Sequence, residues 1–155
     1  MPHDSPVTSR PFVPGDLKAL YAIEEVCFAP PLRFSRSLMR SLSEDSNCRT
    51  WVACVNGIRA GFAIVGLVRE GDEFTAYIWT IEVLPGFRRL GIAKQLLARV
   101  EESAREGVCQ SIELHVAEQN LEAQALYRGL GFAPIGLEPE FYGKGQNGLR
   151  YRKML

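Results

Sequence analysis

The chain has 155 residues, a formal net charge of zero and a hydrophobic content of 46%, as expected for one globular domain with a core of its own. The balanced charge gives no electrostatic reason to bind nucleic acid or a membrane surface, and the apolar runs are too short to span a bilayer. Two histidines and four cysteines without C-x-x-C spacing argue against a zinc cluster. We therefore predict no metal, and reduced thiols in the cytoplasm.

The N-terminal third is predicted to hold a lead, a strand and two helices. We expect residues 1–8 to be a disordered lead and residues 9–155 to form the single domain. Asp16 is placed to cap a helix over residues 17–26, whose apolar side chains share one face. Prolines exclude a helix from the segment after it, and Ser35 then begins a second short helix.

Most of the remaining chain has the pattern of β-strands. The pair Asn56 and Gly57, between two apolar stretches, is a strong β-hairpin signal. A helix is predicted to begin near Ile92, because apolar residues recur on one helical face, and another over residues 121–130 is ended by Gly131. The strands are expected at residues 9–13, 50–55, 58–68, 74–83, 111–116, 133–137 and 148–154.

The loop between the strand at 74–83 and the next helix has the composition of an anion site. Gly91 and Ala93 leave the backbone bare where the helix begins. The first N–H groups of a helix have no internal partner and carry partial positive charge, so a bound anion can satisfy them. Full positive charges nearby come from Arg88, Arg89 and Lys94. This arrangement predicts a binding site for a diphosphate.

Two kinds of diphosphate loop share part of this pattern. Gly86 and Gly91 have the G-x-x-x-x-G spacing of a nucleoside triphosphatase loop. However, Ile92 and Ala93 stand where that loop has Lys and then Ser or Thr. The pattern Arg88-x-x-Gly91-x-Ala93 instead resembles the R/Q-x-x-G-x-G/A signature of the GCN5-related N-acetyltransferase (GNAT) superfamily. In that family the loop binds the diphosphate of acetyl-CoA.

A second block resembles the later half of the same family. Residues 114–120, LHVAEQN, combine a strand with an Asn, and a short helix with Tyr127 and the closing pair Gly131 and Phe132 follow. The two blocks occur in the family's order with one helix between them. The resemblance implies the GNAT fold, an α/β fold with one mixed, mostly antiparallel central sheet of about six or seven strands and about four helices on both of its faces.

The resemblance also implies acetyl-CoA as co-substrate. Backbone groups of Ile81 and Val83 are expected to contact the pantetheine and the thioester carbonyl. The full set of implied coenzyme contacts is Ile81, Val83, Arg88, Arg89, Leu90, Gly91, Ile92, Ala93, Lys94, Asn120 and Tyr127.

Acetyl transfer to an amine needs one group that takes the ammonium proton and another that donates a proton or a hydrogen bond to the departing thiolate. Tyr127 lies where the family places a Tyr near the coenzyme sulfur, so we expect its hydroxyl to donate to the thiolate. The alternative is that Tyr127 is a structural aromatic residue. His115 can accept a proton near neutral pH, and a structural histidine is its alternative. Glu82, near the end of the central strand, is a rival base if burial raises its pKa, and otherwise a solvated or salt-bridged side chain.

More narrowly, the chain resembles protein N-terminal acetyltransferases. In one eukaryotic branch a Tyr and a His on neighbouring central strands act as bases through water, and Tyr77 and His115 match those positions. The bacterial ribosomal-protein-alanine N-acetyltransferases carry a Glu where His115 stands. The resemblance therefore implies the Tyr–His arrangement or a different acceptor.

The C-terminal part resembles the family's acceptor groove. Residues 138–143, EPEFYG, are similar to its Tyr-Tyr segment, with Phe141 in place of the first Tyr. Residues 143–148, GKGQNG, precede no helix, so this G-x-G-x-x-G is interpreted as a hairpin loop, which in the family borders the groove. The implied acceptor contacts are Phe28, Pro30, Leu32 and Tyr142.

We therefore expect an acetyl-CoA-dependent N-acetyltransferase that works by direct attack in a ternary complex, with the α-amine of a protein or peptide N-terminus as acceptor. An α-amine has a pKa of about 7.7–8.0 and loses its proton more easily than a lysine at about 10.4. Acetylation of a small amine and a non-catalytic acetyl-CoA-binding regulatory module are alternatives. Zero net charge and the lack of an acidic cluster argue against a polycationic acceptor. We expect no nucleic-acid or membrane partner, and a homodimer is an open alternative to a monomer.

Overall fold

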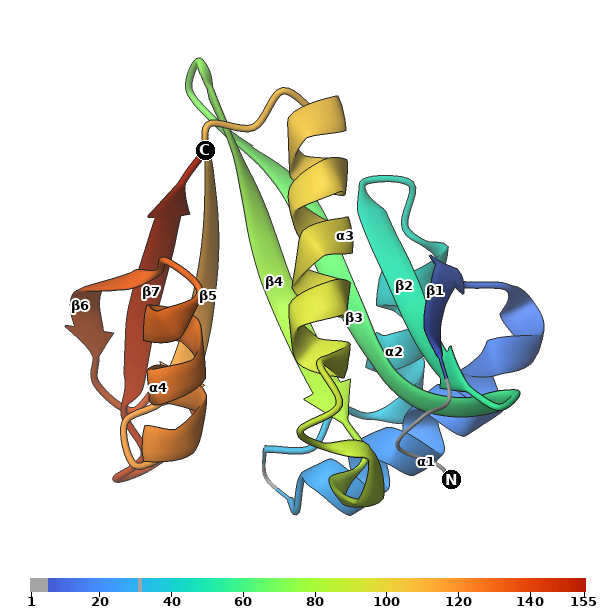
Figure 1. The fold of residues 1–155 in the computed structure, drawn as a ribbon. Helices are drawn as coiled ribbons and strands as arrows, with labels where there is room; N and C mark the ends of the chain where they lie inside the picture. The colour runs from blue at the N-terminus through green and yellow to red at the C-terminus, as the bar shows by residue number, and fades with distance from the viewer. Residues whose placement is uncertain (1–5, 31) are drawn as a thin grey trace.

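The computed structural model describes residues 6–30 and 32–155, and within them seven strands form one mixed sheet in the order β1-β2-β3-β4-β5-β7-β6 (Figure 1). Neighbouring strands are antiparallel except β4 and β5, which are parallel. The strands are β1 (Val7–Pro11), β2 (Cys48–Val55), β3 (Ile58–Glu70), β4 (Glu73–Val83), β5 (Ser111–Ala117), β6 (Ala133–Glu138) and β7 (Gly148–Met154). The predicted mixed, mostly antiparallel sheet is confirmed.

Helices cover both faces of the sheet. They are α1 (Leu17–Cys27), α2 (Arg36–Glu44), α3 (Ile92–Glu106) and α4 (Leu121–Gly129). The long helix α3 crosses the face that is turned to the viewer in Figure 1, where Leu96 and Val100 pack into one buried cluster. The helices α1 and α2 pack on the other face, around Phe62 and Ile64 of β3. No helix in the described part of the chain is long and apolar enough to cross a membrane.

Local sequence signals formed the elements that they predicted. The Ser35 hydroxyl accepts a hydrogen bond from the Leu38 amide at 3.1 Å and so caps α2. Asn56 and Gly57 have φ values of 52° and 77°, the left-handed pair that a tight hairpin requires. Gly131, with φ of 97°, lies just after α4, where an L side chain would be strained. These local predictions are confirmed.

The first strand lies earlier than predicted. β1 spans Val7–Pro11 rather than 9–13, because it pairs with β2 from Val7 opposite Val55 to Pro11 opposite Trp51. Two residues of the predicted lead therefore belong to the sheet, and residues 1–5 of that lead lie outside the described residues. Pairing with a distant strand sets these limits, and local propensity does not reveal it.

Candidate active site

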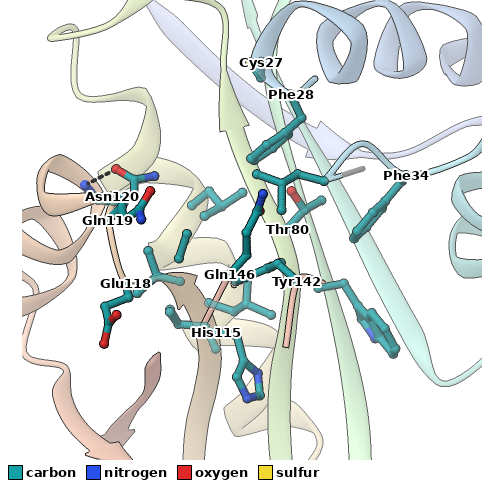
Figure 2. A pocket seen from close by; sticks show the side chains of 18 of the residues that line it. Cys27, Phe28, Phe34, Thr80, His115, Glu118, Gln119, Asn120, Tyr142 and Gln146 are labelled. Carbon is teal, nitrogen blue, oxygen red and sulfur yellow. Dashed lines mark hydrogen bonds between the residues drawn. The ribbon is translucent and has the colours of Figure 1, made fainter. Parts of the chain in front are cut away.

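The candidate site lies where two parallel strands separate. β4 and β5 are paired only from Thr75 opposite Ser111 to Ile78 opposite Leu114, although both strands continue beyond this point. Figure 1 shows them diverging toward the end of β4. Between them lies a cavity of about 570 Å³, lined by β4 from Ile78 to Ile81, by residues 114–120, and by parts of α1, α4 and the loop before β7 (Figure 2). The edge of β4 that faces this cavity has no strand partner, so its backbone groups are free to bind a ligand.

A bulge in β4 decides which side chains share a face. Ile64 pairs with Thr80 while the next residue, Val65, pairs with Ile78, so Trp79 is an extra residue without a partner. The alternation of side chains is reversed there. As a result Tyr77 and Glu82, five positions apart, lie on the same face of the sheet as α1, although strict alternation would separate them.

Tyr77 and His115 are brought together, as the resemblance implied. The Tyr77 hydroxyl lies 2.7 Å from Nδ1 of His115. Nε2 of His115 lies 2.9 Å from a carboxylate oxygen of Glu138, and the ring stacks on Phe141 with centroids 3.9 Å apart. Burial raises the pKa of Tyr77 above its ordinary range, so the phenol stays protonated at neutral pH. His115 lines the cavity, whereas Tyr77 supports it from behind.

Glu82 is buried, and it faces a second carboxyl that sequence reasoning missed. The Glu82 side chain is 3% exposed and accepts a hydrogen bond from the Thr80 hydroxyl at 2.6 Å. Burial, and then the neighbouring carboxyl of Glu24 on α1, raise the pKa of Glu82 well above its ordinary value. The solvated or salt-bridged alternative for Glu82 is therefore wrong. The fold thus brings together two acids that are distant in the sequence. The signal for Glu24 was a charged residue four positions after Leu20 on the apolar face of α1.

Tyr127 lines the cavity from α4 and is 8% exposed. Its ring packs against Phe132 with centroids 5.8 Å apart. No hydrogen bond among the described residues engages its hydroxyl, which leaves that group available to a ligand. Burial raises the pKa of Tyr127, so it can donate a hydrogen bond but is a weak acid in the resting site.

The acceptor side is apolar and comes from two loops. Phe28, Leu32 and Tyr142 line the cavity, as implied, while Pro30 is exposed and does not line it. The Arg33 guanidinium donates to the Phe28 carbonyl at 2.9 Å and closes the loop after α1. Burial raises the pKa of Tyr142 to about 12. Further lining residues, beyond the implied contacts, are Cys27, Phe34, Trp79, Thr80, Gln119 and Gln146.

The predicted diphosphate loop has the backbone that an anion needs. Arg89 and Gly91 have φ values of 65° and 82°, and α3 begins with no side-chain cap and no acid in its first turn. The amides at the start of α3 are therefore free for an anion, beside the exposed side chains of Arg89 and Lys94. Arg88 differs from this expectation, because its Nε donates to the Val83 carbonyl at 3.2 Å. The loop fits a diphosphate.

Two of the implied coenzyme contacts, Val83 and Asn120, have further structural roles. Ile81 lines the cavity, but Val83 does not, and the Val83 carbonyl accepts contacts from Cys27 and Arg88. Asn120 lines the cavity and also caps α4, because its Oδ1 accepts a hydrogen bond from the Ala123 amide at 3.1 Å. Among the described residues there is no group of acidic, histidine and cysteine side chains that could hold a metal ion.

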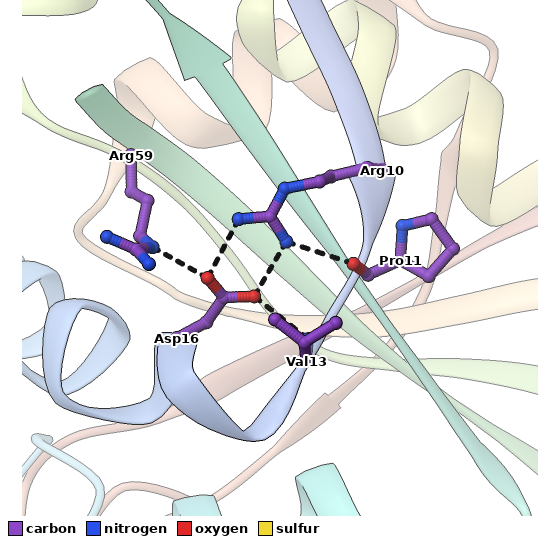
Figure 3. Close-up of polar contacts among 5 residues, drawn as sticks. All are labelled: Arg10, Pro11, Val13, Asp16 and Arg59. Carbon is purple, nitrogen blue, oxygen red and sulfur yellow. Dashed lines mark hydrogen bonds and ion pairs between the residues drawn. The ribbon is translucent and has the colours of Figure 1, made fainter. Parts of the chain in front are cut away.

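A buried ion-pair network anchors α1, which carries Glu24 (Figure 3). The Asp16 carboxylate accepts hydrogen bonds from Arg10 at 2.7 and 2.8 Å, from Arg59 at 2.6 Å and from the Val13 amide at 2.9 Å. It makes no side-chain capping bond to α1. The prediction that the Asp16 side chain caps this helix is therefore wrong, because its carboxylate is bound by two arginines and by the Val13 amide in the turn before the helix. The network ties β1, β3 and the start of α1 together.

The comparisons with known proteins agree with this geometry. Residues 17–132 match the model of the acetyltransferase (GNAT) family. The chain belongs to the GNAT family. Its fold also matches Arabidopsis thaliana NAA60 in complex with acetyl-CoA, with a TM-score of 0.84 over 97% of this chain and 99% of that one, at 23% identity.

Two curated GNAT relatives differ in the acceptors that their names give. Streptothricin acetyltransferase of Streptomyces lavendulae is 38% identical over 100 residues, which are 64% of this chain and 52% of that protein. N-alpha-acetyltransferase RimI of Mycobacterium tuberculosis is 29% identical over 142 residues, which are 88% of this chain and 85% of that protein. The chain thus spans about half the length of the first relative and most of the second.

Proposed function

We propose that this GNAT protein is an acetyl-CoA-dependent N-acetyltransferase that transfers the acetyl group directly to a primary amine in a ternary complex. The acceptor that we propose is the α-amine of a peptide or protein N-terminus. The observation that carries the proposal is the cavity between the diverging strands β4 and β5, which Ile81, Tyr127 and His115 line together. It brings an unpaired strand edge, a free hydroxyl and an apolar acceptor side into one space.

The coenzyme end of the site is assigned to α3 and its loop. The free amides at the start of α3, with Arg89 and Lys94, would hold the diphosphate. The unpaired edge of β4 at Ile81 would hold the pantetheine, and the Tyr127 hydroxyl would donate a hydrogen bond to the sulfur as it gains charge. None of these roles requires a protein nucleophile.

The acceptor end is suited to a peptide N-terminus. Phe28, Leu32 and Tyr142 offer apolar surface for a first side chain, and an α-amine with a pKa of about 7.7–8.0 is easily deprotonated there. The name of the relative RimI, an N-alpha-acetyltransferase, supports this acceptor by analogy.

Two groups could take the ammonium proton. Nδ1 of His115 contacts the Tyr77 hydroxyl, and Nε2 lies 2.9 Å from Glu138 but makes no hydrogen bond among the described residues. We assign His115 to orienting the acceptor. The carboxyl route, through the buried acids Glu24 and Glu82 beside the cavity, is favoured because no cation pairs with either acid among the described residues.

The test is release of free thiol from acetyl-CoA with a panel of peptides that differ in their first residue. We expect turnover with peptides that begin with a small or apolar residue, none with the same peptides blocked at the α-amine, and an added acetyl mass on the first residue. Tight acetyl-CoA binding without turnover on any amine would contradict the proposal and favour a regulatory module.

A small-molecule amine is the second candidate acceptor. Its support is the similarity to streptothricin acetyltransferase and the buried acid pair beside the cavity, which suits an amine cation. The same thiol-release assay with polyamines and amino-sugar antibiotics discriminates between the two. Faster turnover on these compounds than on every peptide would replace the peptide acceptor.

A further inference from the structure

Two buried carboxyl groups, those of Glu24 and Glu82, lie within hydrogen-bonding reach of each other beside the cavity. Glu24 on α1 has no exposed surface, and Glu82 on β4 is 3% exposed. One oxygen of each is satisfied, since Oε2 of Glu24 accepts the Phe34 amide at 3.2 Å and Oε2 of Glu82 accepts the Thr80 hydroxyl at 2.6 Å. The remaining Oε1 of each has no hydrogen-bond partner among the described residues. Two unsatisfied buried oxygens at one place need an explanation.

No cation compensates this pair. The ion pairs of residues 6–30 and 32–155 include neither Glu24 nor Glu82. Two carboxylates within hydrogen-bond range in a buried place cannot both be ionised, because like charges repel and burial penalises each charge. A single proton held between the two carboxyls removes both problems, since it gives unsatisfied oxygens a hydrogen bond.

Resting on the proposed acetyl transfer, we propose that Glu24 and Glu82 share one proton in the wall of the cavity, and that Glu24 takes the proton of the acceptor's ammonium group. Glu24 is the member of the pair that lines the cavity, and Glu82 lies behind it. Glu24 is therefore the catalytic residue, directly or through one water, and Glu82 is a positioning residue that acts through it.

The proton balance of the step is complete. The acceptor enters as an ammonium ion and gives one proton to the pair, which then holds two. The nitrogen lone pair forms the bond to the thioester carbonyl carbon, and the electron pair of the breaking carbon–sulfur bond leaves on sulfur. The nitrogen loses a second proton, which reaches the sulfur by way of the Tyr127 hydroxyl, and the pair returns its extra proton to solvent. The products are the amide, the free thiol and one proton.

Other titratable groups around the pair are neutral, with one cation. The Cys27 thiol on α1 and the Tyr127 hydroxyl on α4 both sense the charge of Glu82. Burial raises the pKa of each, so both stay protonated near neutral pH. Arg88, after β4, lies beside Cys27 and is held by the Val83 carbonyl.

The first experiment needs no substrate. In protein labelled with ¹³C at the glutamate carboxyl carbons, NMR titration of the wild type should show one carboxyl signal that still titrates above pH 7. That signal should be absent in Glu24→Gln and in Glu82→Gln, and present in Glu25→Gln, the matched control from the exposed side of α1. If all glutamates of the wild type titrate below pH 6, or if Glu25→Gln also removes the signal, the shared proton is refuted. If Glu82→Gln does not fold, Glu24→Gln decides alone.

The second experiment measures catalysis in the same variants. Glu24→Gln should lower kcat/KM for the amine by about 100-fold, with the acetyl-CoA Kd unchanged within about twofold. Glu82→Gln should cost less, about tenfold, and Glu25→Gln nothing. Activity of Glu24→Gln within threefold of the wild type would overturn the catalytic role while leaving the NMR result intact. A wild type that acetylates no amine would instead refute the proposed function, and the NMR titration would still decide the shared proton.

Discussion

The Tyr77 hydroxyl on β4 lies 2.7 Å from Nδ1 of His115 on β5. His115 directly follows Leu114, the last residue of β5 that pairs with β4. Because burial keeps Tyr77 protonated, the phenol can donate this hydrogen bond and fix the imidazole ring at the cavity wall. Tyr77 is thus unsuited to act as a base by itself, and its contribution is the orientation of His115.

We therefore expect Tyr77→Phe to lower kcat/KM for a peptide about tenfold, because the ring of His115 loses the hydrogen bond that orients it. The acetyl-CoA Kd should not change. Tyr21→Phe is the control, since Tyr21 lies outside the cavity and packs under Arg36. Steady-state kinetics on both variants decide, and an equal loss in the two would refute the orienting role.

Tyr127→Phe should lower kcat while the KM values for both substrates stay close to those of the wild type. The Tyr127 side chain is 8% exposed and its hydroxyl has no hydrogen-bond partner among the described residues, so a hydrogen bond to the sulfur would strengthen as the sulfur gains charge. Its removal should cost about 10- to 100-fold. Pre-steady-state thiol release measures the chemical step itself. An unchanged rate would remove Tyr127 from the mechanism and leave it a structural aromatic.

Arg89→Ala should weaken acetyl-CoA binding about three- to tenfold, because an exposed charge beside the free amides of α3 is lost. The Kd of the wild type should rise with salt more steeply than that of the variant. Arg105→Ala, at the opposite end of the same helix, is the matched control and should bind like the wild type. Equal affinities in all three proteins would refute the assignment of this loop.

Asp16→Asn should destabilise the protein by about 1–2 kcal/mol at pH 7, because Arg10 and Arg59, which are both partly exposed, lose their buried anion. The hydrogen bonds from Arg10 hold the folded pKa of Asp16 well below its ordinary value, so its contribution is present above pH 4. As pH falls through 4 toward the folded pKa, the wild type should lose this advantage over the variant.

Urea unfolding of the wild type and Asp16→Asn at several pH values measures that difference. Asp72→Asn, at an exposed turn, should match the wild type throughout. A stability difference for Asp16→Asn that stays constant from pH 7 to pH 3 would contradict the ion-pair explanation.

Local patterns predicted the elements better than they predicted the contacts. Ser35 and the pair Asn56 and Gly57 act within a few residues of themselves, so their roles could be predicted from sequence. Asp16 was expected to cap a helix, but its carboxylate binds Arg59, which lies 43 positions away in the sequence. Only the folded chain shows such a contact.

The candidate site shows the same division. The family resemblance placed Tyr127 and the pair Tyr77 and His115 in the cavity region, because motifs keep their order along the chain. The role of Glu24 could not be predicted from the sequence, because its partner Glu82 is remote along the chain and because the bulge at Trp79 turns Glu82 toward α1. A strict alternation of strand side chains does not foresee that turn.

The most direct test is calorimetric titration of folded protein with acetyl-CoA. We expect saturable binding of one equivalent, weakened in Arg89→Ala and unaffected in Arg105→Ala. Absence of any saturable binding to the folded wild type would contradict this expectation.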